Sequence, residues 1–148
     1  MLCKNRRCFL AILLVFLVLI ICFFMVPLYK AQYLLHNLKE DDVVSIDATF
    51  GAYPAYPLEK RDQATLINYI QSIKLSVATS NYKDYDGVRS QMFVLHMKDN
   101  SSVGISACSP FFIIDNKGYM SKSDSCKQID EMFSRYVGII QANSAPQI

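Results

Sequence analysis

The chain has 148 residues, of which 52% are hydrophobic, and a formal net charge of +2. The charge is uneven, because residues 1–30 hold four basic and no acidic residues, whereas residues 31–148 hold eleven basic and thirteen acidic residues. A mildly acidic region lacks the concentrated basic surface that nucleic-acid binding requires, and it disfavours tight docking on anionic lipid. We therefore expect no nucleic-acid partner.

An uncharged stretch from Phe9 to Tyr29 dominates the N-terminal part. At about 1.5 Å per residue it makes a helix of roughly 31 Å, which matches the hydrocarbon thickness of a bilayer. Sixteen of its residues are Leu, Ile, Val or Phe, so insertion is favoured by roughly 5 to 10 kcal/mol. Lys4, Arg6 and Arg7 precede it, and flanking basic residues stay in the cytoplasm. The sequence predicts a single-pass protein of the cell membrane, with residues 1–8 cytoplasmic, residues 9–29 in the lipid bilayer as a signal anchor, and the remainder extracytoplasmic.

Two alternatives compete with a retained anchor. A cleaved signal peptide has an apolar region of about 7 to 15 residues followed by small residues, whereas Tyr29 is bulky at the nearest candidate cleavage site. A lipoprotein would be acylated on Cys22, but Ile21 stands where such sites have a small residue. The retained anchor is therefore favoured.

Beyond the span, residues 30–42 are expected to prolong the helix as a juxtamembrane stalk that ends in charged residues. Residues 43–138 have the length of one compact domain, and residues 139–148 are expected to form a disordered tail. In the domain, the period-two alternation of Val44, Ile46, Ala48 and Phe50 predicts a strand. Further strands are predicted at 75–79, 88–98, 103–107 and 111–114. The turn Asp115-Asn116-Lys117-Gly118 is expected to close a hairpin that returns through Tyr119 and Met120.

Two helices are predicted from apolar residues that recur every three or four positions. The first includes Leu66 and Ile70 and has Asp62 as its candidate N-cap, and the second includes Ile129 and Tyr136 and ends near Gly138. Short turns join the later strands as hairpins and exclude parallel crossovers. The sequence thus predicts an α+β fold in the order β-α-β-β-β-β-α, with two helices packed on one face of a small antiparallel sheet.

Cys108 and Cys126 are the two cysteines of the exported region. A disulfide between them would close a loop of about 19 residues and stabilise the fold by about 3 kcal/mol. Two separate buried thiols are the alternative. Tyr53 and Tyr56 each precede a proline in a stiff loop, where they are candidates either for a partner contact or for packing on the domain's own core.

The exported region contains no GxSxG, HExxH, CxxC or glycine-rich phosphate loop. We therefore expect no cofactor and assign no catalytic or metal-binding residue. One enzymatic alternative is a thiol nucleophile, Cys108, with His96 as its base, since both lie in the predicted central hairpin.

The segment SACSPFFIIDNKGYMSKSDSC, followed by a helix, resembles small membrane-anchored exported domains of low-GC Gram-positive bacteria that have no assigned function. The resemblance is carried by Ser109-Pro110, by Lys117 to Tyr119 and by Cys126, and it extends from Val44 to Gly138. It implies a topology and a location, and no catalytic residue.

The expected function is a non-catalytic binding or regulatory role of the extracytoplasmic domain toward an envelope protein or a small ligand. Two other functions stay open from the sequence alone. One is a thiol-dependent enzyme that uses Cys108, and the other is an accessory membrane subunit that contacts its partner through residues 9–29.

Overall fold

The fold is described by a computed structural model that covers residues 2–84 and 91–144. Its helices are α1 (Leu2–Asn37), η1 (Glu40–Asp42), α2 (Lys60–Ser72), η2 (Asn81–Asp84) and α3 (Asp124–Ser144). Its strands are β1 (Val43–Phe50), β2 (Tyr56–Pro57), β3 (Leu75–Thr79), β4 (Gln91–Met97), β5 (Ser102–Cys108), β6 (Phe111–Ile114) and β7 (Lys117–Ser121). The predicted start of β4 at Val88 lies outside the described residues.

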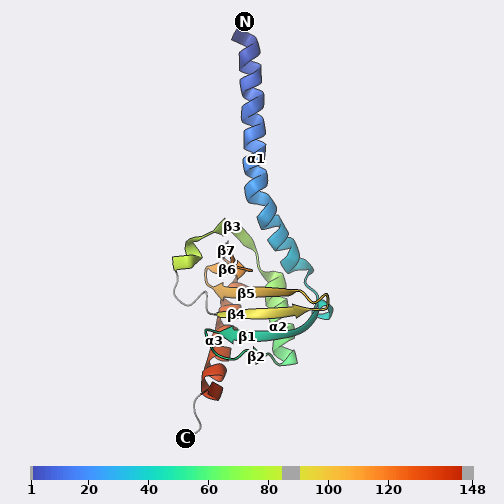
Figure 1. The fold of residues 1–148 in the computed structure, drawn as a ribbon, viewed down its shortest axis with the longest axis vertical. Coiled ribbons are helices and arrows are strands. Elements are labelled where there is room, and N and C mark those ends of the chain that lie inside the picture. Colours follow the sequence, from blue (N-terminus) through green and yellow to red (C-terminus); the bar gives the residue numbers. More distant parts are fainter. Residues whose placement is uncertain (1, 85–90, 145–148) are drawn as a thin grey trace.

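All seven described strands form one antiparallel sheet in the order β2-β1-β4-β5-β6-β7-β3. This confirms the predicted α+β class with an antiparallel sheet. The expected element order omitted two strands: β7 and the two-residue β2, which pairs with β1 despite its proline. In Figure 1 the sheet stands below the apolar part of α1, with β3 nearest to it and β2 furthest away.

The turn between β6 and β7 follows from its sequence. Ile114 pairs with Lys117, which leaves Asp115 and Asn116 as a two-residue loop. Both loop residues have positive φ, 46° and 63°, as a type I′ turn requires and as Asp and Asn tolerate. The predicted hairpin is therefore confirmed at this position.

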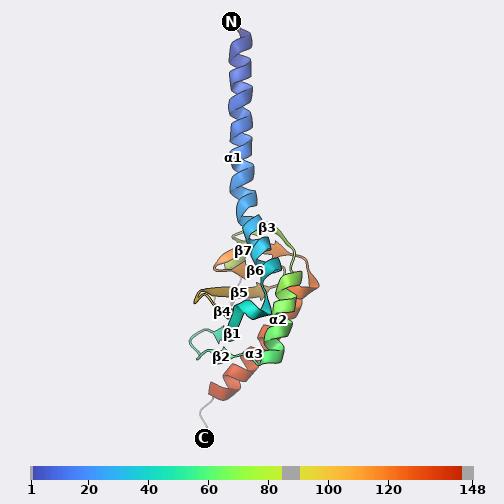
Figure 2. The same ribbon diagram turned by 90° about the vertical axis from the view of Figure 1, so that its right-hand side faces the viewer.

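The segment that was expected to be a stalk belongs to the domain. Helix α1 continues to Asn37. Its last turns place Ala31 and the fully buried Leu35 in the main core, and Leu38, the residue after the helix, is buried there too. These residues recur at intervals of four and three, so one side of the helix is apolar and needs a partner. Figure 2 shows this end of α1 beside α2.

The two other long helices begin or end differently from the expectation. Helix α2 begins at Lys60, so Asp62 lies in its first turn and is not its N-cap. Helix α3 continues past Gly138 to Ser144, because Ile140 extends its buried stripe one turn beyond Tyr136. Residues 139–144 of the expected disordered tail are therefore helical, and residues 145–148 lie outside the described residues.

One main core joins all layers of the domain. Helix α3 packs on β1, β4 and β5, while α2 packs on α3 and on the last turns of α1. Phe93 at the centre of the sheet contacts Phe133 and Tyr136 of α3 edge to face, at centroid distances of 5.0 and 6.2 Å. A second, smaller cluster of Tyr82, Phe111 and Ile113 is separate from this core.

Candidate binding site

A cavity of about 440 Å³ lies between the end of α1 and the sheet. Its lining is mostly apolar and comes from two distant parts of the sequence. The residues that line it are Tyr29, Lys30, Tyr33, Leu34, Leu35, Asn37, Leu38 and Asp42 on one side and Leu95, Met97, Val103 and Ile105 of β4 and β5 on the other. A concave apolar site of this size, with a few polar groups, is typical of small-molecule binding sites.

Two glutamine side chains hold α1 in the position that forms this cavity. The amide of Gln32 donates a hydrogen bond to the carbonyl oxygen of Ile73 (2.8 Å), and its oxygen accepts one from the backbone N–H of Leu75 (2.7 Å). The amide of Gln71 on α2 donates to the carbonyl oxygen of Leu38 (2.6 Å). Two of these bonds pair carbonyl oxygens at the ends of α2 and α1, where the helix supplies no partner, and the third pairs the first backbone N–H of β3. The wall formed by α1 is thus fixed to α2 and β3.

The cavity has an apolar base and an amphipathic rim. Leu35 and Ile105 are buried at the base, whereas Tyr29 and Tyr33 are exposed and stack with a centroid distance of 6.4 Å. The exposed Lys30 adds a cationic group to the rim. This arrangement suits a ligand with an apolar body and a polar or anionic end.

Sequence reasoning missed this cavity, because it assigned residues 30–42 to a stalk. The stripe of Ala31, Leu35 and Leu38 was the available signal that this segment packs on something. The pairing of that stripe with β4 and β5 depends on tertiary structure, which the local pattern does not specify.

The two candidate tyrosines of the proline-rich loop have different surroundings. Tyr53 is exposed by 42% and stacks on Phe50 at 5.6 Å. Tyr56 lies in β2, and its ring packs against Tyr136 of α3 at 6.1 Å. Tyr56 therefore contributes to the domain's own packing, and a partner contact through Tyr53 or the half-buried Tyr56 stays a prediction.

The structure does not bring Cys108 and His96 together. His96 pairs with Ser102, which is the first residue of β5, whereas Cys108 is the last residue of that seven-residue strand. At about 3.3 Å per residue, roughly 20 Å separates the two positions. His96 instead bonds to the carboxylate of Asp47 at 2.9 Å. The catalytic pair proposed for a thiol enzyme is therefore excluded in this fold.

Both cysteines of the candidate disulfide are free thiols in the structure. Cys108 packs beside the small cluster of Tyr82, Phe111 and Ile113, whereas Cys126 is fully buried in the main core and its thiol bonds to the carbonyl oxygen of Phe111 (3.3 Å). Burial, aided by the negative charge of Asp130, raises the pKa of Cys108 and raises that of Cys126 to about 12. Such thiols are weak nucleophiles. The bridge between them stays a prediction.

Within the described ranges, no cluster of three or more His, Cys, Asp or Glu residues could hold a metal ion. Comparison of the chain with protein-family models, curated proteins and solved structures finds no match. The function must therefore be argued from the geometry of the chain itself.

Proposed function

We propose that this chain is a single-pass membrane protein whose extracytoplasmic domain has a non-catalytic binding role. Within the described residues, α1 is the helix that is long and apolar enough to span a bilayer. The large apolar side chains described between Phe9 and Val26 are exposed by 42% to 76%. A helix that is apolar on all sides needs a lipid or protein environment, which supports the anchor. The basic residues before the span support a cytoplasmic N-terminus.

The observation that carries the binding role is the apolar cavity between α1 and the β4–β5 hairpin. Its rim begins at Tyr29, the last residue of the proposed span, so a ligand could enter it from the membrane surface. The chemistry of its lining favours a small amphiphile whose apolar part contacts Leu95, Val103 and Ile105. No arrangement of nucleophile and base accompanies this site in the described residues, which is why we propose binding and not turnover.

A photoactivatable fatty acid tests this role in the full-length protein reconstituted in phosphatidylcholine vesicles. After irradiation, mass spectrometry should find the label on the β4–β5 peptide that contains Met97 and Val103. Val103→Phe narrows the cavity and should strongly reduce this label. Val44→Phe is the matched control, because Val44 is an exposed strand valine outside the cavity lining. Equal labelling of the β4–β5 peptide in both variants would contradict a ligand site in the cavity.

The accessory-subunit alternative makes a different prediction. If the span itself is the interface, replacement of residues 9–26 by an unrelated apolar span, which keeps the rim residue Tyr29, should abolish the partner contact and leave fatty-acid labelling of the cavity unchanged. Loss of labelling after this replacement would instead mean that the span orients the domain for ligand entry.

A further inference from the structure

The sheet is oriented so that one of its edges faces the proposed membrane. Strand β3 is an edge strand of the sheet, and it contacts α1. Both ribbon views place β3 at the end of the domain nearest to the apolar part of α1 (Figures 1 and 2). Five strand spacings of about 4.8 Å, roughly 24 Å, separate β3 from β1. Strand position in the sheet therefore measures distance from the proposed membrane surface.

A contact with α1 fixes the depth of this edge. Pro27 of α1 lines a hollow of about 340 Å³ together with Ala78, Thr79, Lys83 and Lys117. Pro27 lies two residues before the end of the proposed span, which corresponds to about 3 Å along the helix. Strand β3 and η2 are thus level with the headgroup layer, not held away from it by a stalk.

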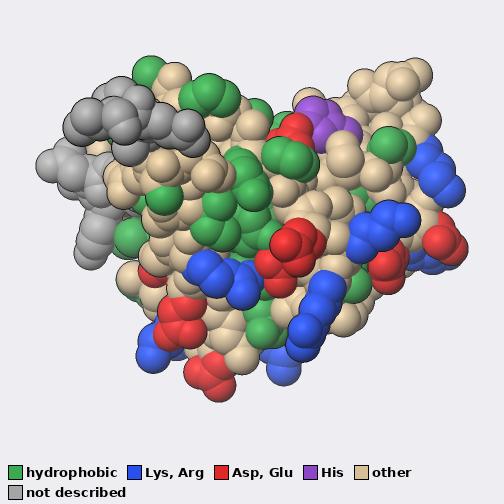
Figure 3. Space-filling model, turned by 90° about the horizontal axis from the view of Figure 1, so that it is seen from below, with side chains coloured by type: hydrophobic (Ala, Val, Ile, Leu, Met, Phe, Trp, Pro, Cys, Tyr) green, Lys and Arg blue, Asp and Glu red, His purple; other side chains and the backbone are tan. Residues whose placement is uncertain are grey.

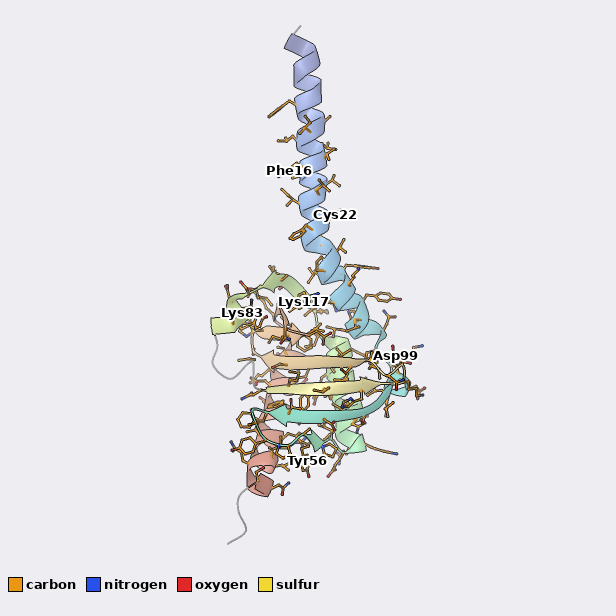
Figure 4. The ribbon with its side chains drawn as sticks, in the orientation of Figure 1. Phe16, Cys22, Tyr56, Lys83, Asp99 and Lys117 are labelled. Atoms are coloured by element: carbon orange, nitrogen blue, oxygen red, sulfur yellow. The ribbon has the colours of Figure 1, made fainter. Side chains whose placement is uncertain are left out.

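Exposed lysines gather at this edge. Lys74 at the start of β3 and Lys122 after β7 line one hollow, while Lys83 and Lys117 line the other. Figure 4 shows Lys83 and Lys117 at the end of the domain next to α1, with Tyr56 at the opposite end. Val77 of β3, which lies between Lys74 and Lys83 in the sequence, has an exposed side chain.

Acidic residues are also present near this edge, and Asp84 directly follows Lys83 in the sequence. Asp124 lines the hollow of Lys74 and Lys122. The carboxylate of Asp115 accepts a hydrogen bond from the backbone N–H of Gly104 (2.8 Å). The ion pairs among the described residues do not involve the four lysines. By contrast, the end of the domain seen in Figure 3 carries acidic and basic side chains side by side.

The edge is held rigidly on one side by Tyr82. Its hydroxyl donates a hydrogen bond to the carbonyl oxygen of Asn116, and its ring lies against Gly118, where a Cβ atom would come within 2.0 Å of the ring. This contact fixes η2 on the β6–β7 hairpin. It keeps Lys83 beside Lys117, so the two charges are presented together.

We infer that the β3 edge, defined as Lys74, Val77, Lys83, Lys117 and Lys122, docks on the phosphate headgroups of anionic lipids in the membrane that holds α1. The inference rests on the membrane attachment proposed above. It differs from the expectation based on net charge, because the acidic excess of the domain does not describe the local charge of this edge. Lysines are attracted to an anionic membrane surface when they lie within about one Debye length of it, roughly 8 Å at physiological salt.

Tryptophan fluorescence tests the inference, because the sequence contains no tryptophan. Val77→Trp and the matched control Val44→Trp both replace an exposed strand valine. The full chain is reconstituted in vesicles of phosphatidylcholine alone or mixed with phosphatidylglycerol, with a nitroxide quencher on the phosphatidylcholine headgroup. Quenching of Val77→Trp should exceed that of Val44→Trp severalfold, and it should rise with phosphatidylglycerol and fall at high salt.

Charge reversal supplies the second arm. Lys83→Glu with Lys117→Glu should abolish the rise with phosphatidylglycerol, whereas Lys60→Glu with Lys98→Glu, two exposed lysines elsewhere, should leave it intact. Equal quenching at both tryptophan positions, or no dependence on lipid charge, would overturn the inference. Quenching that does not depend on lipid charge would mean that the lysines instead prevent the edge strand from pairing with a strand of another chain. Failure of the membrane attachment is distinguishable, because the protein would then not be recovered with the vesicles.

Discussion

The side-chain amide of Gln32 on α1 donates a hydrogen bond of 2.8 Å to the carbonyl oxygen of Ile73 at the end of α2. This bond joins the helix of the proposed anchor to the folded domain. Together with the burial of Leu35, it means that the end of α1 is packed into the domain and does not act as a flexible linker.

Gln32→Ala should weaken this junction. The substitution removes the hydrogen bonds to the backbone of Ile73 and Leu75. Because part-buried backbone groups then lose their partner, the free energy of unfolding should fall by about 1 to 3 kcal/mol. Thermal unfolding of the full chain in detergent should show a lower midpoint. Asn37→Ala, which removes one exposed bond within α1, is the matched control and should change the midpoint little. Equal midpoints for the two variants would contradict the role given to Gln32.

Gly118→Ala should destabilise the edge that holds η2. The new Cβ would overlap the ring of Tyr82, and such overpacking typically costs about 1 to 3 kcal/mol. In a Tyr82→Ala background the cost should fall, although contact with the carbonyl oxygen of Thr79 at 2.8 Å leaves part of it. A double-mutant cycle from denaturant unfolding measures the coupling. Additive effects would mean that Tyr82 does not pack on Gly118.

Ionisation of Tyr136 should lower the free energy of unfolding at alkaline pH. Burial, together with the hydrogen bond from its hydroxyl to Asp62 (2.6 Å), raises the pKa of Tyr136 to about 12. The unfolded value is about 10, so the stabilising effect is complete below pH 10 and is lost as pH rises toward 12. Tyr136→Phe should lower the unfolding free energy by about 1 to 2 kcal/mol at pH 8. The difference from wild type should shrink by pH 11, and a constant difference across this range would contradict the assignment.

Tyr136→Asp should be far more damaging than Tyr136→Phe. Its carboxylate would lie in the core beside Asp62, where neither burial nor the neighbouring charge favours it. We expect loss of the cooperative unfolding transition in circular dichroism. A melting curve like that of wild type would show that this side of α3 is not buried.

The two cysteines of the folded domain, Cys108 and Cys126, should differ in reactivity. Cys108 is partly exposed and Cys126 fully buried, so iodoacetamide should modify Cys108 first in the native protein and Cys126 only after unfolding. Peptide mapping by mass spectrometry without reduction gives the order. A peptide that links Cys108 to Cys126 would instead demonstrate the disulfide predicted from the sequence.

The sequence predicts the sheet well where the pattern is local. Alternating residues in β1 and the Asp115-Asn116 turn specify strands and a hairpin without reference to the rest of the chain. The errors arise where a local signal is weaker than tertiary packing. Gly138 predicts an end of α3, but Ile140 is buried in the core and the helix continues to Ser144.

The candidate site was beyond prediction for a related reason. Residues near Tyr33 and residues near Val103 form its walls, and nothing in either segment specifies the other. The charged run Glu40–Asp42 suggested that the chain had left the helix for solvent, and this concealed the apolar stripe just before it. The expectation for Cys108 and His96 fails for another reason. Both residues lie in one hairpin, but the strand register pairs His96 with Ser102, at the opposite end of β5 from Cys108.

Substituted-cysteine labelling in intact cells tests the central claim most directly, namely that α1 spans the membrane with the domain outside. A membrane-impermeant maleimide should modify Val44→Cys in intact cells, and it should modify the natural Cys3 and Cys8 only after the membrane is permeabilised. Labelling of Cys3 and Cys8 in intact cells while Val44→Cys stays protected, or recovery of the protein in the soluble fraction, would contradict the account.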